Sequence, residues 1–568
     1  MKRIPATAGL AMLILAVLTL GAAPVWACSP DCFNKKSYPV NRPAPNPYLA
    51  SSLYGIVHFD SSASDSTPYG PPKGAFLVDP EKEKISYGGP GNLMTLASTN
   101  PDYMWQPSTD RVQYIYKKGK QWIPVAKLDL LDLISNGTYP AVSDETLQAF
   151  GEAPAAGMTP SDMDAYLKSL FGDNYAGRMG NGVYTLVSSE NVLYANYNGV
   201  ILGIALKNPR RPEAGIEIRY RLDDPVLKIQ GTTGARAMGL SMTYDGHIIV
   251  TFTNGVAVID RQLTLKTKSF YPFAAGERVS NSLCVDEKNG IYIVSNTVMR
   301  KLVWTGKTIS DKATDGAWSS TYSTSTEVAP IARFDNGSGS SPTLMGFGKD
   351  KDKLVIITDG NKQMNLVAFW RDKIPAGFTE RIAGTIPVTC GYTTLPEWIQ
   401  SEQSVVVHGY GAFVVNNIPE SVEPALKAAP NNFIKIGLMG PAYPGPHGVE
   451  RFQWDTRTHS WESAWGRPDV SSPSMIPLHS DSGNMAVVGG YIPDLGWVVQ
   501  GLDWDTGDTV HLTILGPENY GNGYYAILQF LENGDLLFNG FAGAIRVHYN
   551  DWWDRYHKWH NRYDPWHR

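Results

Sequence analysis

From about residue 180 onwards, short segments with alternating apolar and polar residues recur along the chain, and tight polar turns join them. Leu240–Thr251 alternates on both sides of Asp245-Gly246, and Leu283–Ser295 does so around Asn289-Gly290. Alternation with a period of two predicts β-strands. Asn-Gly or Asp-Gly between two such segments predicts a hairpin, because both central residues tolerate a positive φ. Further copies occur at Val183–Tyr197, Leu344–Thr358, Met475–Tyr491 and Ile527–Asn539.

A second hairpin follows most of these units, and successive turns lie roughly 40 to 60 residues apart, which is the period of tandem four-stranded blades. Sustained helical periodicity is missing, which excludes a solenoid of helical repeats. We therefore predict an all-β chain in which residues 51–550 form a single β-propeller of seven or eight blades. Closing the blades into a ring removes the exposed sheet edges that would otherwise aggregate.

Three segments depart from the β pattern. Residues 143–172 are predicted to be a short helical insertion, because Thr159 is a good N-cap, Pro160 suits the first helical position and Gly172 suits the end. Residues 28–50, rich in Pro and Asn, indicate an extended N-terminal arm. Residues 551–568 form a tail rich in aromatic residues and His, which we expect to pack on the side of the propeller.

The first 27 residues have the features of a signal peptide. Lys2 and Arg3 precede a short apolar run, and Val25-Trp26-Ala27 resembles a cleavage site, so we expect a periplasmic or secreted protein. No later stretch reaches the roughly 18 apolar residues of a transmembrane segment. Cleavage would leave Cys28 first, where a lipid anchor is an alternative. Trp26 fits poorly before a lipidated cysteine, so export without a lipid anchor is favoured.

The chain has four cysteines, an even number that allows disulfide bonds in an exported protein. Cys28 and Cys32 lie close enough in sequence to close a small loop, and we predict a disulfide between them. Cys284 and Cys390 would have to meet across the fold, and otherwise each is a small buried apolar residue.

The amino-acid composition limits the kinds of partner that we expect this protein to bind. The chain has 568 residues, of which 43% are hydrophobic and 18% charged, so it can bury a large core. Its net charge of −5 offers no concentrated basic surface, and nucleic acid is therefore not expected as a partner. A small-molecule ligand in the mouth of the channel is expected instead.

The residues that lead into the innermost strand of each propeller blade crowd around one mouth of the channel. In this chain they are repeatedly Asn, Ser, Arg and Tyr, which indicates a ring of polar groups or, alternatively, ordinary loop capping. We select Arg236 as a catalytic residue that binds an anion, and Ser341, Asn522 and Tyr524 as substrate-binding residues.

A second candidate lies in the Pro- and Gly-rich loop 441–450. His447 and Glu450 are three residues apart there and could act as a catalytic proton-transfer pair, since imidazole titrates near neutral pH. The alternative is a loop whose His makes only local hydrogen bonds.

Two motifs resemble known propeller families. Residues 281–290 resemble the inner-strand motif of gluconolactonase-like propellers, which implies that Asn281 is a ligand of a divalent cation such as calcium. Asp503–Gly507 and, more loosely, Asp455–Trp461 resemble the docking motif of quinoprotein-like propellers, which implies pyrroloquinoline quinone (PQQ) as a cofactor. The adjacent cysteine pair that many quinone-dependent dehydrogenases carry is absent from the sequence.

The sequence therefore supports two functions. The first is an exported enzyme acting on a small molecule in the central channel, as a hydrolase or lactonase with a bound divalent cation or as a quinoprotein-like oxidoreductase. The second is a non-catalytic propeller that binds ligands or proteins. Propellers host both kinds of function, so the fold does not choose between them.

Overall fold

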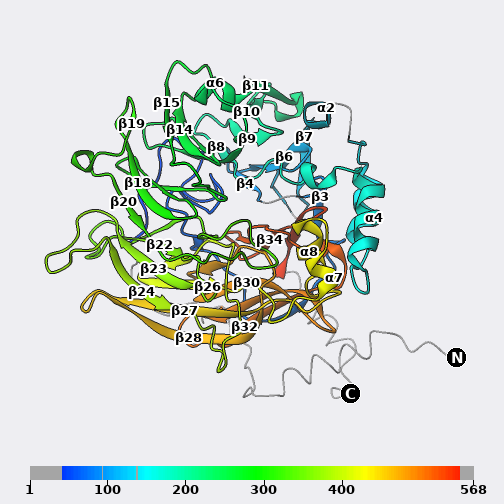
Figure 1. The fold of residues 1–568 in the computed structure, drawn as a ribbon. Helices are drawn as coiled ribbons and strands as arrows, with labels where there is room; N and C mark the ends of the chain where they lie inside the picture. The colour runs from blue at the N-terminus through cyan, green and yellow to red at the C-terminus, as the bar shows by residue number, and fades with distance from the viewer. Residues whose placement is uncertain (1–40, 92–93, 120, 136–138, 550–568) are drawn as a thin grey trace. The chain divides into compact units, whose positions relative to one another are not determined.

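The computed structural model describes residues 41–91, 94–119, 121–135 and 139–549 (Figure 1). Within these ranges the strands form eight sheets, and each sheet contains a meander of antiparallel strands that follow one another along the chain. This arrangement is typical of a β-propeller. The signal peptide 1–27, most of the N-terminal arm, both Cys28 and Cys32, and the tail 551–568 lie outside the described residues.

In most sheets the innermost strand comes first in the chain and the others follow it outward. The first sheets contain β4 (Leu96–Ala97), β5 (Tyr103–Pro107), β6 (Arg111–Tyr116) and β7 (Ile123–Asp129); then β8 (Leu186–Val187), β9 (Leu193–Tyr197), β10 (Val200–Leu206) and β11 (Ile216–Leu222). The next are β12 (Ala237–Met242), β13 (Ile248–Phe252), β14 (Gly255–Ile259) and β15 (Lys268–Pro272); then β16 (Cys284–Val285), β17 (Gly290–Val294), β18 (Val298–Trp304) and β19 (Ile309–Ser310), with β20 (Trp318–Thr321) also paired to β18.

The remaining sheets include the two that recruit strands from the start of the chain. They contain β21 (Thr343–Met345), β22 (Leu354–Thr358), β23 (Asn365–Trp370) and β24 (Ile382–Pro387); then β25 (Val406–His408), β26 (Gly411–Val415), β27 (His447–Asp455) and β28 (Ser460–Ser471). Next, β29 (Leu478–Ser480), β30 (Met485–Ile492), β31 (Gly496–Asp503) and β32 (Thr509–Gly516) are flanked by β1 (Ser66–Thr67) and β2 (Gly74–Leu77); last, β33 (Gln529–Phe530), β34 (Leu536–Asn539) and β35 (Gly543–Val547) are completed by β3 (Lys84–Tyr87).

Burial along the strands follows their position in the sheet. All five residues of β13 are buried, as are those of β14, whereas the outermost strand β15 is exposed or half-buried throughout. A strand that is buried on both faces is rich in Val and Ile rather than alternating. Apolar side chains of neighbouring sheets interlock: Ile249 and Val258 pack in one cluster with Val285 and Ile293 of the next sheet. The core therefore lies between the sheets.

The predicted helical insertion contains α3 (Asp144–Glu152) and α4 (Pro160–Phe171). The Thr159 hydroxyl accepts the N–H of Asp162, whose carboxylate accepts the N–H of Thr159 in return, and Gly172 ends the helix at a φ of 88°. The other helices are α2 (Leu131–Ser135), α5 (Tyr175–Arg178), α6 (Pro225–Gln230), α7 (Pro424–Lys427) and α8 (Asn432–Leu438), with short 3-10 helices at Pro212–Ala214, Ala313–Asp315 and Asn519–Gly521. None of the described helices is long and apolar enough to cross a membrane.

Helices from two distant parts of the chain pack together. Phe150 of α3 and Phe171 of α4 share one apolar cluster with Phe433 and Leu438 of α8. Figure 1 shows α4, α7 and α8 on the same side of the sheets. This cluster, which we call the helical cap, places the start of α8 beside loops that lead into the inner strands.

Residues 46–67, which we call the central segment, run past the innermost strand of every sheet. Backbone carbonyls of the segment accept the N–H groups of inner-strand residues Ala97, Val187, Val285, Leu344, Val407 and His479, at 2.7 to 3.0 Å. The last two inner strands are reached by side chains, since Asn46 Nδ2 donates to the Met242 carbonyl at 3.1 Å and the Tyr54 hydroxyl donates to the Phe530 carbonyl at 2.9 Å. An inner strand has an open hydrogen-bonding edge, and the central segment satisfies part of it in each sheet.

The path of the central segment requires unusual backbone conformations. Tyr54, His58, Phe59, Ala63 and Asp65 all have positive φ values, between 48° and 74°, although none is glycine. Such conformations cost free energy and persist only where the surroundings impose them. In this segment they turn the chain so that successive carbonyls face different sheets. Phe59 is completely buried and anchors the segment in the core.

Cys284 and Cys390 are both buried and neither forms a disulfide bond. Each fills a small space in an apolar cluster, Cys284 beside Tyr292 and Cys390 beside Val388. Burial raises the pKa of both thiols well above the ordinary value, so they remain protonated and unreactive at neutral pH.

Candidate functional site

A cavity of about 790 Å³ lies where the inner strands begin. Residues that lead directly into seven of these strands line it, namely Tyr184, Arg236, Asn281, Ser341, Ser404, Ile476 and Ile527. Val57 and His58 of the central segment also line the cavity, as do Asn432 and Phe433 of the helical cap. The cavity is therefore bounded by the sheets, the central segment and the helical cap, and its size suits one small organic molecule.

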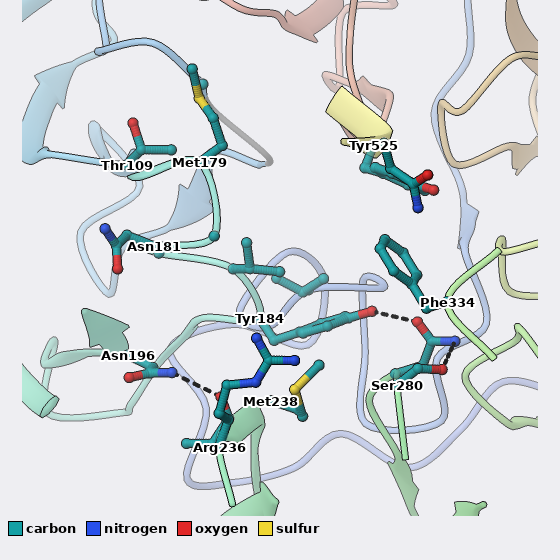
Figure 2. Close-up of a pocket in the computed structure, with 18 of the residues that line it drawn as sticks. Thr109, Met179, Asn181, Tyr184, Asn196, Arg236, Met238, Ser280, Phe334 and Tyr525 are labelled. Carbon is teal, nitrogen blue, oxygen red and sulfur yellow. Dashed lines mark hydrogen bonds between the residues drawn. The ribbon is translucent and has the colours of Figure 1, made fainter. Parts of the chain in front are cut away.

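Aromatic side chains dominate one side of the cavity (Figure 2). Tyr524 packs between Phe433 and Phe541, with ring centroids 4.8 and 5.7 Å away, and Tyr525 lies 5.0 Å from Tyr524. Phe334 is 55% exposed although it lines the cavity, with its ring 6.2 Å from that of Tyr525. Much of the Phe334 ring is therefore accessible to a molecule in the cavity.

Glu402 is the most unusual polar group of the cavity. Its side chain is 1% exposed, and Oε1 lies 3.2 Å from Nη1 of the equally buried Arg333 and accepts the N–H of Phe334 at 3.1 Å. Oε2 is buried and makes no hydrogen bond of good geometry with a described residue, although the Asn281 side chain is near enough to the carboxyl to lower its pKa. Burial outweighs the attraction of Arg333 and raises the pKa of Glu402 to about 6.

A second titratable group lies at the floor of the cavity. His58 Nδ1 is 2.9 Å from Oδ2 of Asp65, and both side chains are almost completely buried. The Ser404 hydroxyl lies 3.4 Å from His58 Nε2. Ser404 and Glu402 both line the cavity. The His58 ring is thus oriented by a carboxylate and stands in the same cavity as Glu402.

Some residues that line the cavity have left-handed backbone conformations. Tyr184 and Tyr525, which line opposite parts of it, have φ values of 54° and 50°, and His58 has a φ of 64°. Left-handed conformations of bulky residues are uncommon and persist where the surrounding structure imposes them. The Tyr184 hydroxyl donates to Oδ1 of Asn281 at 3.2 Å.

Four residues selected from the sequence line this cavity: Arg236, Asn281, Ser341 and Tyr524. Arg236 is exposed, and its side chain forms no ion pair with another described residue, which leaves it available to an anionic group. The Ser341 hydroxyl accepts the N–H of Ser282 at 3.2 Å. Asn281 donates to the hydroxyl of Ser280 at 3.3 Å and to the Gly339 carbonyl.

The other three selected residues are not among those that line the cavity. Glu450 is buried in β27, where its carboxylate accepts the N–H groups of Thr389 and Cys390, both at 2.6 Å. The His447 carbonyl accepts the Tyr392 hydroxyl at 3.1 Å. Asn522 is buried, and its Nδ2 has no hydrogen-bond partner among the described residues. The structure therefore does not bring Arg236 and Glu450 together.

Sequence reasoning missed Glu402 and did not place His58 in this cavity. Glu402 directly precedes Gln403 and Ser404, so its position in front of an inner strand was a signal that could have found it. His58 had no such signal, because nothing in the local pattern shows that the central segment lies across the inner strands.

The residues at Asn281 do not fit the calcium site that the resemblance implies. Calcium takes six to eight oxygen ligands, mostly carboxylates and carbonyls. The Asn281 amide oxygen already accepts the Tyr184 hydroxyl, and the Glu402 carboxylate beside it is neutralised by Arg333. A cation would compete with that guanidinium for the same charge.

The residues do not fit PQQ either. PQQ carries three carboxylates, which need several cationic partners. Three arginines line or adjoin the cavity, but Arg278 is paired with Asp335 at 2.9 Å and Arg333 with Glu402. Of these three, only Arg236 is without a carboxylate partner among the described residues, so one guanidinium is left for the three carboxylates of PQQ.

No protein-family model matches the chain. An uncharacterized protein of Archaeoglobus fulgidus is 30% identical over 341 residues, and the matched region spans 56% of this chain and 61% of the relative.

Among solved structures, quinohemoprotein alcohol dehydrogenase from Comamonas testosteroni is similar with a TM-score of 0.46 and 11% identity, over 87% of this chain and 76% of that one. Quinohemoprotein alcohol dehydrogenase ADHIIG from Pseudomonas putida gives a TM-score of 0.43 at 11% identity, with the same two coverages. Dihydro-heme d1 dehydrogenase gives 0.37 at 9% identity, over 76% of this chain and 69% of that one. The prediction of a mostly β chain built from successive antiparallel sheets is confirmed by the sheet topology. With TM-scores below 0.5, these similarities carry no information on activity or cofactor.

Proposed function

We propose that this protein is an enzyme that carries out acid–base chemistry on a small molecule bound in the cavity, in the manner of a hydrolase or lactonase. Glu402 is the proton-transfer group, and the His58–Asp65 pair is a second one on the floor. The proposal rests on one observation above all. Glu402 is a buried carboxyl in a ligand-sized cavity, and its Oε2 makes no hydrogen bond of good geometry with a described residue.

The chemistry follows from the position and the pKa of this group. A general base works best when its pKa is near the working pH, and the pKa of Glu402 is raised to about 6. Near pH 7 most of the carboxyl is ionised, so Oε2 can take a proton from a water molecule that attacks an ester or lactone carbonyl. Arg333 and the Phe334 N–H hold Oε1 and fix the direction of Oε2.

The shape and lining of the cavity suggest the substrate. The aromatic wall formed by Phe334, Tyr524 and Tyr525 suits a flat apolar ring, and Arg236 suits an anionic substituent or a developing negative charge. We therefore expect dihydrocoumarin and phenyl acetate to be better substrates than γ-butyrolactone, which has no aromatic ring.

The test compares the wild-type protein with Glu402→Gln on these three compounds. The variant should lower kcat by at least about 100-fold, as expected when a general base is removed, while ligand binding persists. The control is Glu397→Gln, because Glu397 is exposed and, among the described residues, is paired only with Lys362. Equal rates for wild type and Glu402→Gln would overturn the assignment. Ligand binding without turnover by either protein would favour a binding propeller.

We also propose that the eight sheets are the blades of one ring and that the chain is exported. Export rests on residues 1–27, and a Cys28–Cys32 disulfide would form in the oxidising compartment. The mass of the exported protein under denaturing conditions, before and after reduction, tests cleavage before Cys28, a lipid on Cys28 and the disulfide together. An uncleaved chain recovered from the cell extract would contradict export.

A further inference from the structure

A cluster of two histidines and one aspartate lies at the far ends of two inner strands. His408 is the last residue of β25, His479 belongs to β29, and Asp481 follows β29. The cavity lies where these same strands begin, so the cluster is at the opposite end of the inner strands from Glu402. It plays no part in the proposed function.

The three side chains approach one another at the spacing of metal ligands. Asp481 Oδ1 lies 3.1 Å from His408 Nδ1 and 3.2 Å from His479 Nδ1. Two ligands of a tetrahedral Zn²⁺, each about 2.0 to 2.1 Å from the ion, are separated by about 3.3 Å. The Ser66 hydroxyl lies 3.2 Å from His479 Nδ1 and 3.4 Å from His408 Nδ1, and thus stands beside the same point.

Hydrogen bonds do not explain the position of Asp481 Oδ1. Asp481 Oδ1 is buried and has no hydrogen-bond partner among the described residues, although two ring nitrogens lie within 3.2 Å of it. His479 is 1% exposed, and its Nε2 is also without a hydrogen-bond partner among the described residues. Buried polar atoms without partners are costly, and in native proteins they usually indicate a ligand, an ion or an ordered water.

We propose that His408, His479 and Asp481 bind one divalent transition-metal ion of the Zn²⁺ type, with Ser66 or a water molecule at the remaining position. Two imidazoles and one carboxylate suit Zn²⁺ and its neighbours in the first transition row, whereas calcium and magnesium prefer oxygen ligands alone. A metal at this point ties the end of the central segment to two neighbouring sheets, because Ser66 belongs to that segment.

Two features of the surroundings bear on coordination. Arg42 pairs with the other carboxylate oxygen, Asp481 Oδ2, and so leaves Oδ1 facing the rings. The rings of His408 and His479 stack with centroids 3.8 Å apart and planes at 21°. An imidazole lone pair lies in the ring plane, so binding requires one ring to turn. His408 is 20% exposed and has room for this movement, while His479 is held against Trp504 at 4.5 Å.

The experiment titrates the full chain, free of any affinity tag, with Zn²⁺ and with Co²⁺, whose visible absorption reports its ligands. The variants are Asp481→Asn and His408→Gln. The control is His247→Gln, which removes a histidine that faces a single carboxylate, Asp245, at 3.0 Å. Histidines in the tail 551–568 are present in every protein, so they cancel in the comparison.

Wild type and His247→Gln should bind one more equivalent of metal than Asp481→Asn. The affinity for that equivalent should fall by at least about 100-fold in Asp481→Asn and in His408→Gln. Wild type and His247→Gln, but not Asp481→Asn or His408→Gln, should also melt at a higher temperature when Zn²⁺ is present. If Asp481→Asn and His408→Gln bind as much metal as wild type, with the same affinity and Co²⁺ spectrum, the proposal is wrong. Should Asp481→Asn fail to fold, the partly exposed His408→Gln decides the matter.

Discussion

The raised pKa of Glu402 makes the stability of the folded protein depend on pH in a way that can be isolated by one substitution. Glu402→Gln removes the titrating group but keeps the shape of the side chain. Arg333 retains the carbonyls of Ser401, Asp335 and Gly337 as hydrogen-bond partners, so the guanidinium is not left without acceptors. The substitution therefore changes the free energy of unfolding by an amount that does not depend on pH. The pH-dependent part of the difference between wild type and Glu402→Gln comes from the titration of Glu402.

The size and sign of that part follow from linkage. Below pH 4.5, the ordinary value, the carboxyl is protonated in both the folded and the unfolded chain and has no effect. As the pH rises towards the folded value of about 6, the folded protein holds more protons than the unfolded chain, so the free energy of unfolding falls. The raised pKa corresponds to about 2 kcal/mol of unfolding free energy. This contribution is lost as the pH rises from about 4.5 to 6, and the free energy does not change further above pH 6 on this account.

The measurement is urea unfolding followed by tryptophan fluorescence at several pH values from 4 to 8, for wild type and Glu402→Gln. The difference between the two free energies of unfolding should change by about 2 kcal/mol in the direction that disfavours wild type at high pH. The same comparison with the exposed Glu397→Gln should give no such change. A Glu402→Gln difference that stays constant from pH 4 to 8 would refute the assignment of a raised pKa.

Three further substitutions test other parts of the structure. Tyr54→Phe should lower the free energy of unfolding by about 1 to 3 kcal/mol, because the Phe530 carbonyl loses a buried hydrogen bond; an unchanged urea midpoint would contradict the role of the central segment. Arg236→Gln should weaken binding of benzoate, measured by calorimetry, but not of benzyl alcohol, and equal effects on both would argue against anion binding. Phe334→Ala should weaken binding of both compounds while the melting temperature stays the same, since Phe334 is 55% exposed; a lower melting temperature would indicate a packing role instead.

Much of the fold could be predicted from the sequence because propeller hairpins are local. The Asp245-Gly246 and Asn289-Gly290 turns join β12 to β13 and β16 to β17 as expected, with Gly246 and Asn289 at φ values of 86° and 62°. The helix at Pro160–Phe171 begins and ends where its capping residues indicate. Each of these features depends on residues within one hairpin or one helix.

The candidate site was predicted only in part, and the reason is physical. Residues that precede the inner strands line the same cavity whatever their residue type. Arg236, Asn281 and Ser341 could therefore be selected from their positions in the sequence. The importance of Glu402 depends on its burial beside Arg333, which is set by contacts between segments far apart in the chain. The role of Glu450 also depends on a contact between distant segments. Its carboxylate accepts the N–H of Thr389 from an adjacent strand–loop connection, and this hydrogen bond stabilises the fold.

The central segment links the two ends of the molecule's interior. His58 lies on the floor of the cavity, and Ser66, eight positions further on, stands beside the His408–His479–Asp481 cluster. Between them the chain has positive φ values at Phe59, Ala63 and Asp65, so its path is held by its hydrogen bonds to the inner strands rather than by its own preference. An ion that fixes Ser66 against β25 and β29 would also limit the movement of His58. Metal binding at one end and ligand binding at the other should then stabilise each other, and by linkage the two effects must be equal in free energy.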